Sequence, residues 1–144
     1  MFVTHCYQPS DYLTKAPLPL MMYRVSAGFP SPCDDYLDCK LDLNEHLISN
    51  KASTFLIRAV GDSMANAGIL DGDLLVVDRS LRPQSGDIVI AAVGGDFLVK
   101  RIRIQAHRIL LEAANDNYPT LCISDTAECE VWGVVTSAVH DFRR

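Results

Sequence analysis

Two residues of this sequence stand where a hydroxyl nucleophile and an amine base would be useful. Ser63 follows the strand-like run Thr54–Val60 and comes directly after Gly61-Asp62, so a turn can present its hydroxyl in a cleft. Lys100 lies inside a later apolar run, Phe97–Ile104. In a Ser–Lys dyad the neutral amine removes the hydroxyl proton, and the oxygen then attacks a carbonyl carbon. The chemistry that these residue types predict is acyl transfer, such as peptide hydrolysis.

Lys100 is out of phase with the other cations of its run. Because side chains alternate along a strand, it shares a face with three apolar residues, Leu98, Ile102 and Ile104, which we expect to face the core. The two arginines of the run occupy the opposite, solvated face. Apolar surroundings lower the pKa of a lysine and make it a general base near neutral pH. The alternative is a lysine at the sheet edge that extends its ammonium into water.

Ser63 also has a second interpretation. A serine at this place can cap a short helical turn over Met64–Ala67 and satisfy its free amides. The nucleophile-elbow pattern G-x-S-x-G is not met, because residue 65 is alanine. The four histidines, among them His140, are scattered and none has a context that marks a Ser-His-Asp triad.

The elements that would position this pair are short strands. Several apolar, β-branched runs are spaced along the second part of the chain with almost no helical periodicity. They are Thr54–Val60, Asp73–Asp78, Ile88–Val93, Phe97–Ile104, His107–Ala113 and Glu130–Ser137. Gly94-Gly95 has the composition of a two-residue hairpin turn. The pattern predicts a mostly β fold with one compact antiparallel β domain.

The N-terminal part has a different character. Five of the seven prolines fall within the first 32 residues, which show neither helical nor alternating periodicity. We therefore expect residues 1–40 to form a flexible, extended arm and residues 41–144 to form the β-rich domain. Residues 41–48 could add one or two helical turns where the two parts join.

Composition limits the class of protein. The 144 residues carry 13 Lys+Arg and 18 Asp+Glu, a net charge of −5, which disfavours strong direct DNA binding. Neither a membrane span nor a secretory signal is recognisable. The five cysteines contain no C-x-x-C pair, so we expect reduced thiols, a cytoplasmic location, no metal and no cofactor.

Several motifs, in one order, resemble the self-processing peptidase domain of the LexA/UmuD Ser-Lys peptidase family. They are Gly61-Asp62-Ser63-Met64, Gly68-Ile69-Leu70-Asp71-Gly72-Asp73, Ser85-Gly86-Asp87-Ile88-Val89-Ile90-Ala91 and Phe97-Leu98-Val99-Lys100-Arg101. Upstream, Ala27-Gly28-Phe29-Pro30-Ser31-Pro32 resembles the UmuD cleavage region. The resemblance implies Ser63 as nucleophile, Lys100 as general base and a scissile bond between Ala27 and Gly28.

The short arm favours the UmuD branch of this family over the repressors. Only 27 residues precede the scissile bond, and Pro17 and Pro19 interrupt them, so a helix-turn-helix domain does not fit there. The resemblance further implies a homodimer, stimulation by a RecA–single-stranded DNA filament in a bacterial SOS response, and partnership with a UmuC-like Y-family polymerase in translesion synthesis. Two alternatives stay open: a non-cleaving interaction module that regulates the polymerase, and a LexA-like regulator.

Overall fold

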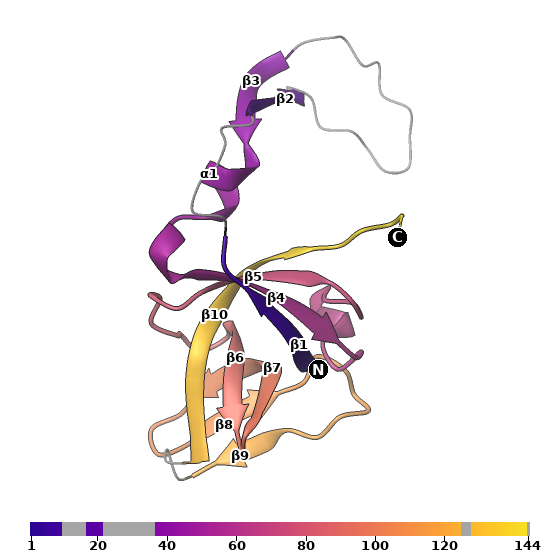
Figure 1. Ribbon diagram of the computed structural model, residues 1–144. Coiled ribbons are helices and arrows are strands. Elements are labelled where there is room, and N and C mark those ends of the chain that lie inside the picture. Colours follow the sequence, from indigo (N-terminus) through magenta and orange to yellow (C-terminus); the bar gives the residue numbers. More distant parts are fainter. Residues whose placement is uncertain (10–16, 22–36, 125–127, 144) are drawn as a thin grey trace. The chain divides into compact units, whose positions relative to one another are not determined.

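The computed structural model describes residues 1–9, 17–21, 37–124 and 128–143, and strands are its main secondary structure (Figure 1). The strands in chain order are β1 (Phe2–Tyr7), β2 (Pro17–Met21), β3 (Leu37–Asp42), β4 (Thr54–Val60), β5 (Leu74–Asp78), β6 (Ile88–Val93), β7 (Asp96–Ile104), β8 (Ile109–Glu112), β9 (Leu121–Ile123) and β10 (Cys129–Val139). The helical elements whose bounds lie within the described residues are α1 (Leu43–Leu47) and two 3-10 turns, η1 (Lys51–Ser53) and η2 (Ala65–Ala67). No helix in these ranges is long and apolar enough to cross a membrane.

The chain divides into two units, and the division differs from the expected boundary at residue 40. One unit comprises residues 1–9 together with 50–144, and the other comprises residues 10–49. In the second unit β2 pairs antiparallel with β3. The expected helical turns follow as α1, whose N-cap Asp42 accepts a hydrogen bond from the Asn44 amide at 2.9 Å. Residues 2–7, expected in the arm, instead form a strand of the first unit.

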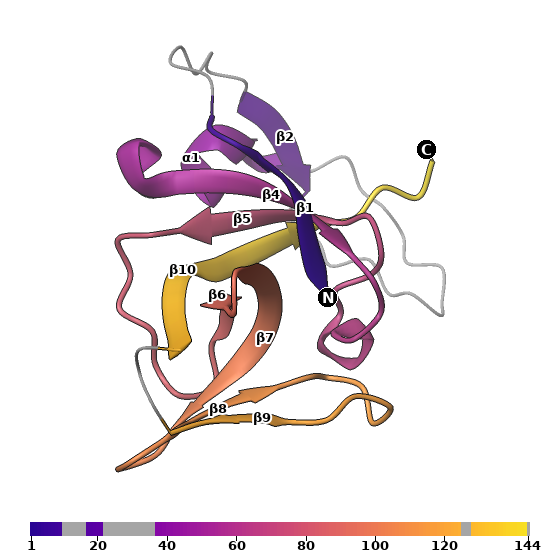
Figure 2. The same cartoon turned by 60° about the horizontal axis from the view of Figure 1, so that its bottom comes forward.

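The first unit is built on one antiparallel sheet that closes on itself. Its strand order is β1-β4-β5-β10-β6-β7-β8-β9, and β1 also pairs with β7. Phe2 makes this closure, since its Cα partners are Val60 on β4 and Leu98 on β7. β1, β4, β5, β10, β6 and β7 therefore form a ring, and the β8–β9 hairpin continues the sheet beyond β7 (Figure 2).

Apolar side chains fill this unit in two clusters. One joins residues of β4, β5, β6 and β7 to the segment after β4, and it includes Met1, Met64 and Val99. The other lies where β8 and β9 pack with β6, β7 and β10, and it includes Ile102 and Leu111. β7 contributes to both clusters because its alternate side chains face opposite sides. Lys100 therefore lies in a strand that is buried on both faces.

The predicted fold class is confirmed: the protein is mostly β and antiparallel. The predicted runs at 54–60 and 88–93 coincide with β4 and β6. The Gly94-Gly95 turn is also confirmed, because both glycines have positive φ, 57° and 88°. β9, however, lies between the predicted runs at 107–113 and 130–137, where no strand was predicted. One residue expected to face the core is also exposed. Ile104 is 46% exposed, since β7 has no partner on β6 beyond Arg101.

Candidate active site

Ser63 lies in a tight turn directly after β4 and has 0% exposure. Gly61 begins the turn with a φ of 106°, a left-handed value that disfavours any side chain there. The Gly61 amide donates to Asp71 Oδ1 at 2.8 Å. Met64, the residue after Ser63, is fully buried, so its side chain anchors the turn in the core. The local sequence thus holds the Ser63 hydroxyl inside the molecule.

The helix-cap interpretation of Ser63 does not apply to this structure. The 3-10 turn η2 begins at Ala65, its N-cap residue is Met64, and no side chain caps it. The Ser63 hydroxyl instead accepts a hydrogen bond from the amino group of Met1 at 2.5 Å. Ser63 is therefore turned toward the interior and away from the helical turn.

Lys100 is buried on β7, opposite Val89 of β6, with 6% exposure. The alternative of an ammonium extended into water is therefore wrong. Burial lowers the pKa of the Lys100 amine, because removal from water disfavours the charged form. A lysine in this state can accept a proton nearer to neutral pH than an exposed one.

The amino group of Met1 contacts the Ser63 hydroxyl. Burial lowers the pKa of this amino group, the charge of Lys100 lowers it further, and the charge of Asp62 opposes the shift. Lys100 and Ser63 are thus both buried, and both influence the Met1 amino group, Ser63 by a hydrogen bond and Lys100 by its charge.

Two residues that the sequence analysis did not single out brace this site. Asn115 Nδ2 donates to the Asp62 carbonyl at 3.0 Å, and the Tyr118 hydroxyl donates to Asp62 Oδ1 at 2.5 Å. Lys100 Nζ also lies 5.7 Å from the centre of the Tyr118 ring. Tyr118 therefore connects the turn that carries Ser63 with the strand that carries Lys100. The sequence signal was only a polar loop containing Asn and Pro, and nothing in it indicated these contacts.

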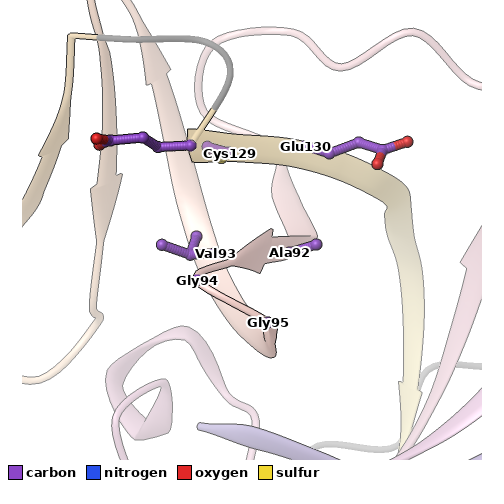
Figure 3. A pocket seen from close by; sticks show the side chains of 7 residues that line it. Ala92, Val93, Gly94, Gly95, Cys129 and Glu130 are labelled. Atoms are coloured by element: carbon purple, nitrogen blue, oxygen red, sulfur yellow. The ribbon is translucent and has the colours of Figure 1, made fainter.

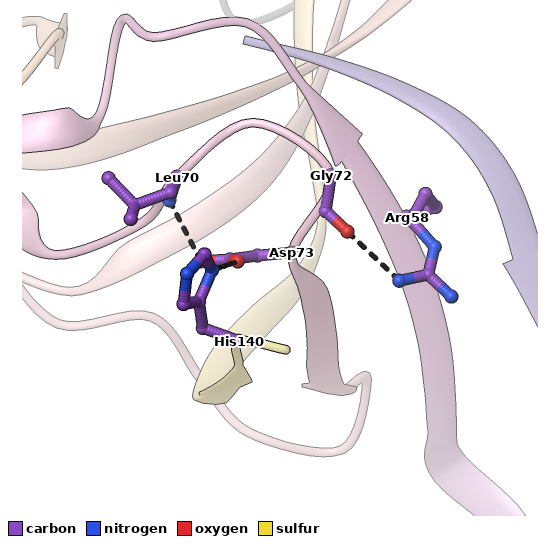
Figure 4. A network of polar contacts seen from close by, with 5 residues as sticks. All are labelled: Arg58, Leu70, Gly72, Asp73 and His140. Carbon is purple, nitrogen blue, oxygen red and sulfur yellow. Dashed lines mark hydrogen bonds and ion pairs between the residues drawn. The ribbon is translucent and has the colours of Figure 1, made fainter. Parts of the chain in front are cut away.

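Another polar network involves a histidine–aspartate pair (Figure 4). His140 Nδ1 lies 2.5 Å from Asp73 Oδ1, while the Leu70 amide donates to Asp73 Oδ2 at 2.8 Å. Arg58 Nη1 donates to the Gly72 carbonyl at 2.9 Å. These contacts tie the turn at residues 70–73 to β4 and to the end of β10. They hold residues 70–73 in place, and Asp71 of this turn accepts the hydrogen bond from Gly61, two residues before Ser63.

Two hollows among the described residues lie away from Ser63 and Lys100. One has a volume of about 540 Å³ and lies at the Gly94-Gly95 turn and the start of β10 (Figure 3). It is formed by Ala92, Val93, Gly94, Gly95, Glu128, Cys129 and Glu130. A small apolar hollow of about 80 Å³ is formed by Val3, Cys6, Ile57, Phe97 and Trp132. Neither lining includes Ser63 or Lys100.

The other predicted site features are the scissile bond, possible metal ligands and the cysteines. Ala27 and Gly28 lie outside the described residues. Within the described residues no three His, Cys, Asp or Glu side chains are grouped to hold a metal ion. Cys6, Cys122 and Cys129 are free thiols.

Comparison with known proteins points to one family. The sequence profile described as "Peptidase S24-like" matches residues 19–136. Protein SamA of Salmonella typhimurium is 44% identical over 135 residues, 94% of each chain. Protein ImpA of Escherichia coli is 47% identical over 125 residues, 87% of this chain and 85% of ImpA. The LexA repressor of Paracidovorax citrulli is 30% identical over 138 residues, 96% of this chain but 61% of the repressor.

Proposed function

We propose that this chain, which belongs to the peptidase S24-like family and within it to the UmuD type, cleaves its own backbone between Ala27 and Gly28. Ser63 is the nucleophile and Lys100 the general base. The observation that supports the assignment most directly is that both side chains are buried and that Tyr118 contacts both Lys100 and Asp62, the residue before Ser63. The matched residues 19–136 include the dyad and the bond.

The mechanism follows from the properties of the two groups. The neutral Lys100 amine takes the proton of the Ser63 hydroxyl as Oγ attacks the Ala27 carbonyl carbon. The backbone N–H of Ser63 stabilises the oxyanion that forms. The Lys100 ammonium then protonates the amine of Gly28, which leaves. Water, deprotonated by Lys100, hydrolyses the ester that joins Ala27 to Ser63 and restores the free hydroxyl.

Small side chains at the bond suit this reaction. Ala27 and Gly28 allow the segment to lie flat in a narrow site, and the prolines that follow favour extended backbone. A RecA–single-stranded DNA filament raises the fraction of molecules with this segment in the site. The trimmed form, residues 28–144, then acts as a homodimer with a UmuC-like polymerase in cytoplasmic SOS mutagenesis. The net charge of −5 fits a protein that leaves DNA contact to these partners.

The test is self-cleavage of purified protein, followed by intact mass. Incubation at alkaline pH, or with RecA, single-stranded DNA and a nucleotide, should release residues 1–27. Ser63→Ala should remain intact although folded, and Lys100→Ala should cleave at least about 100-fold more slowly. Arg101→Ala, which removes the next cation on β7, is the matched control and should cleave normally.

Two results would contradict the proposal in different ways. Cleavage of Lys100→Ala at the normal rate would remove the base from the mechanism. An intact chain under every condition would favour the non-cleaving interaction module instead.

A further inference from the structure

The first strand of the chain lies between the two elements that carry the dyad. Phe2 pairs with Val60 at the end of β4 and with Leu98 on β7. The Val99 amide donates to the Met1 carbonyl at 3.0 Å. β4 leads into the turn of the nucleophile, and β7 carries the base, so β1 bridges the two halves of the site.

Met1 fills the space at the centre of the site. The residue is only 5% exposed and belongs to the same apolar cluster as Met64 and Val99. Its Cα would lie 3.6 Å from a Cβ placed on Gly61, so it packs against the turn of the nucleophile. Its amino group donates to Ser63 Oγ at 2.5 Å. The neighbourhood of the hydroxyl is therefore occupied by the chain itself.

This occupancy is incompatible with attack on a substrate. A scissile carbonyl carbon must come within about 3–3.5 Å of the nucleophilic oxygen, along the direction of a lone pair. The Met1 amino group uses a lone pair of Ser63 Oγ and, at 2.5 Å, lies closer than an attacked carbon would. A peptide segment can react with Ser63 only after Met1 has left.

We propose that β1 is an internal competitive inhibitor of the peptidase, which holds Met1 in the catalytic centre until the strand is released. This inference rests on the proposed self-cleavage and adds a control to it. The segment with Ala27–Gly28, from the same chain or from a second copy, enters the vacated site. β1 lies on the N-terminal side of the bond, so the cut separates the inhibitor from the catalytic body.

The contacts of β1 with its neighbouring strands are limited, as expected for a strand that can detach. Strand pairing of β1 with β7 is limited to Phe2 with Leu98, next to the hydrogen bond from the Val99 amide to the Met1 carbonyl. The pairing with β4 is interrupted by a register shift between Val3 and His5. Phe2 and Tyr7 are 56% and 47% exposed, so part of the apolar surface of the strand contributes little to its binding.

A disulfide lock tests the proposal with a single substitution. Cys6 faces Ile57 across the β1–β4 pair, and antiparallel partners lie about 4.5–5.5 Å apart, within the range of a disulfide. We expect oxidised Ile57→Cys to cleave at Ala27–Gly28 at least about tenfold more slowly than its own reduced form, because the tether keeps β1 seated. The double variant Cys6→Ser, Ile57→Cys has the same change in the core but no bond, so oxidation should leave its rate unchanged.

A release variant tests the opposite direction. Val3 is half-buried against the core, so Val3→Asp should weaken the seat of β1 and speed self-cleavage by about two- to tenfold. Leu81→Asp adds the same charge at an exposed apolar residue outside β1 and should change the rate by less than about twofold. The melting temperature of each variant shows whether the body remains folded.

The outcomes separate this inference from the proposed function. Equal rates for the oxidised and reduced lock, in a protein that does cleave, would overturn the inhibitory role of β1 and leave the self-cleavage intact. Absence of cleavage in every form, reduced, released and at alkaline pH, would overturn the proposed function and the inference with it.

Discussion

At the scale of single residues, the central feature is a lysine kept out of water beside a buried serine. Lys100 shares its strand with Arg101 and Arg103, yet it alone of the three is fully buried. Burial lowers the pKa of its amine. Burying the charged form destabilises the folded protein, but a lowered pKa suits a general base, which must be neutral to act. The pH dependence of the proposed reaction should therefore reflect how deeply Lys100 is buried.

The first prediction concerns pH. A base acts only when neutral, so the rate of self-cleavage should rise about tenfold per pH unit below the pKa of Lys100 and then level off. Because that pKa is lowered, the plateau should begin at a lower pH than for an ordinary lysine, near 10.4. Intact-mass time courses from pH 6 to 11 measure the profile. A rate independent of pH across this range would contradict the assignment.

The second prediction concerns Tyr118. Tyr118→Phe removes the hydrogen bond to Asp62 but keeps the ring near Lys100. We expect cleavage to slow by about three- to tenfold because the turn of the nucleophile loses a brace. Tyr118→Ala also removes the ring and should slow cleavage further and shift the pH profile. Changes in melting temperature with unaltered cleavage in both variants would assign Tyr118 a structural role only.

At the scale of elements, the β6–β7 hairpin decides where Lys100 points. Its register pairs Val89 with Lys100, and a slip by one residue would turn the lysine to the opposite face. The two-residue turn Gly94-Gly95 sets this register, and its positive φ values of 57° and 88° match the twist of the strands. The two glycines therefore help to determine which face of β7 Lys100 occupies.

The third prediction tests that turn in the uncut Ser63→Ala background. Gly95→Val forces a branched side chain into left-handed backbone and should cost about 1–3 kcal/mol in the free energy of unfolding. Gly94→Asn, at a φ of 57° that asparagine tolerates, should stay within about 0.5 kcal/mol. Urea unfolding measures both. Equal stability of the two variants would show that the turn does not determine the hairpin.

At the scale of the whole molecule, the proposed cleavage would change which strands belong to the folded body. β1 precedes Ala27 and Gly28 in the chain, while the other strands of the ring follow them. In the proposed trimmed form, β4 and β7 lose the strand that joins them, and the site opens. The proposed cut would therefore also alter the surface that remains.

The fourth prediction follows from this loss. Residues 28–144 should keep a folded β body but exchange the Val99 amide at least about tenfold faster than uncut Ser63→Ala, because the Met1 carbonyl no longer accepts its hydrogen bond. Hydrogen exchange with mass spectrometry of peptides from β7 and β8 measures the difference. If the Val99 amide exchanged no faster while the Leu111 amide exchanged faster, the result would contradict the prediction.

The sequence alone was sufficient for the fold class and for part of the strands. Alternation and β-branched runs located β4 and β6 but missed β1 and β9, and the out-of-phase Lys100 and the turn at Ser63 predicted a dyad whose two residues the structure places in buried positions. These are local signals, since each depends on neighbours within a few residues. The fold class followed from the same patterns, and so did the resemblance to the family.

Only the tertiary structure decided what lies against that pair. β1 closes the ring through a pairing of Phe2 with Leu98, and Met1 reaches Ser63 across 62 positions of sequence. Tyr118 braces Asp62 across 56 positions. No local pattern encodes such contacts, because they arise when the whole sheet curls and brings its far edges together. Residue types and spacing therefore determined which groups could react, and the closure of the sheet determined that the chain's own first residue occupies their site.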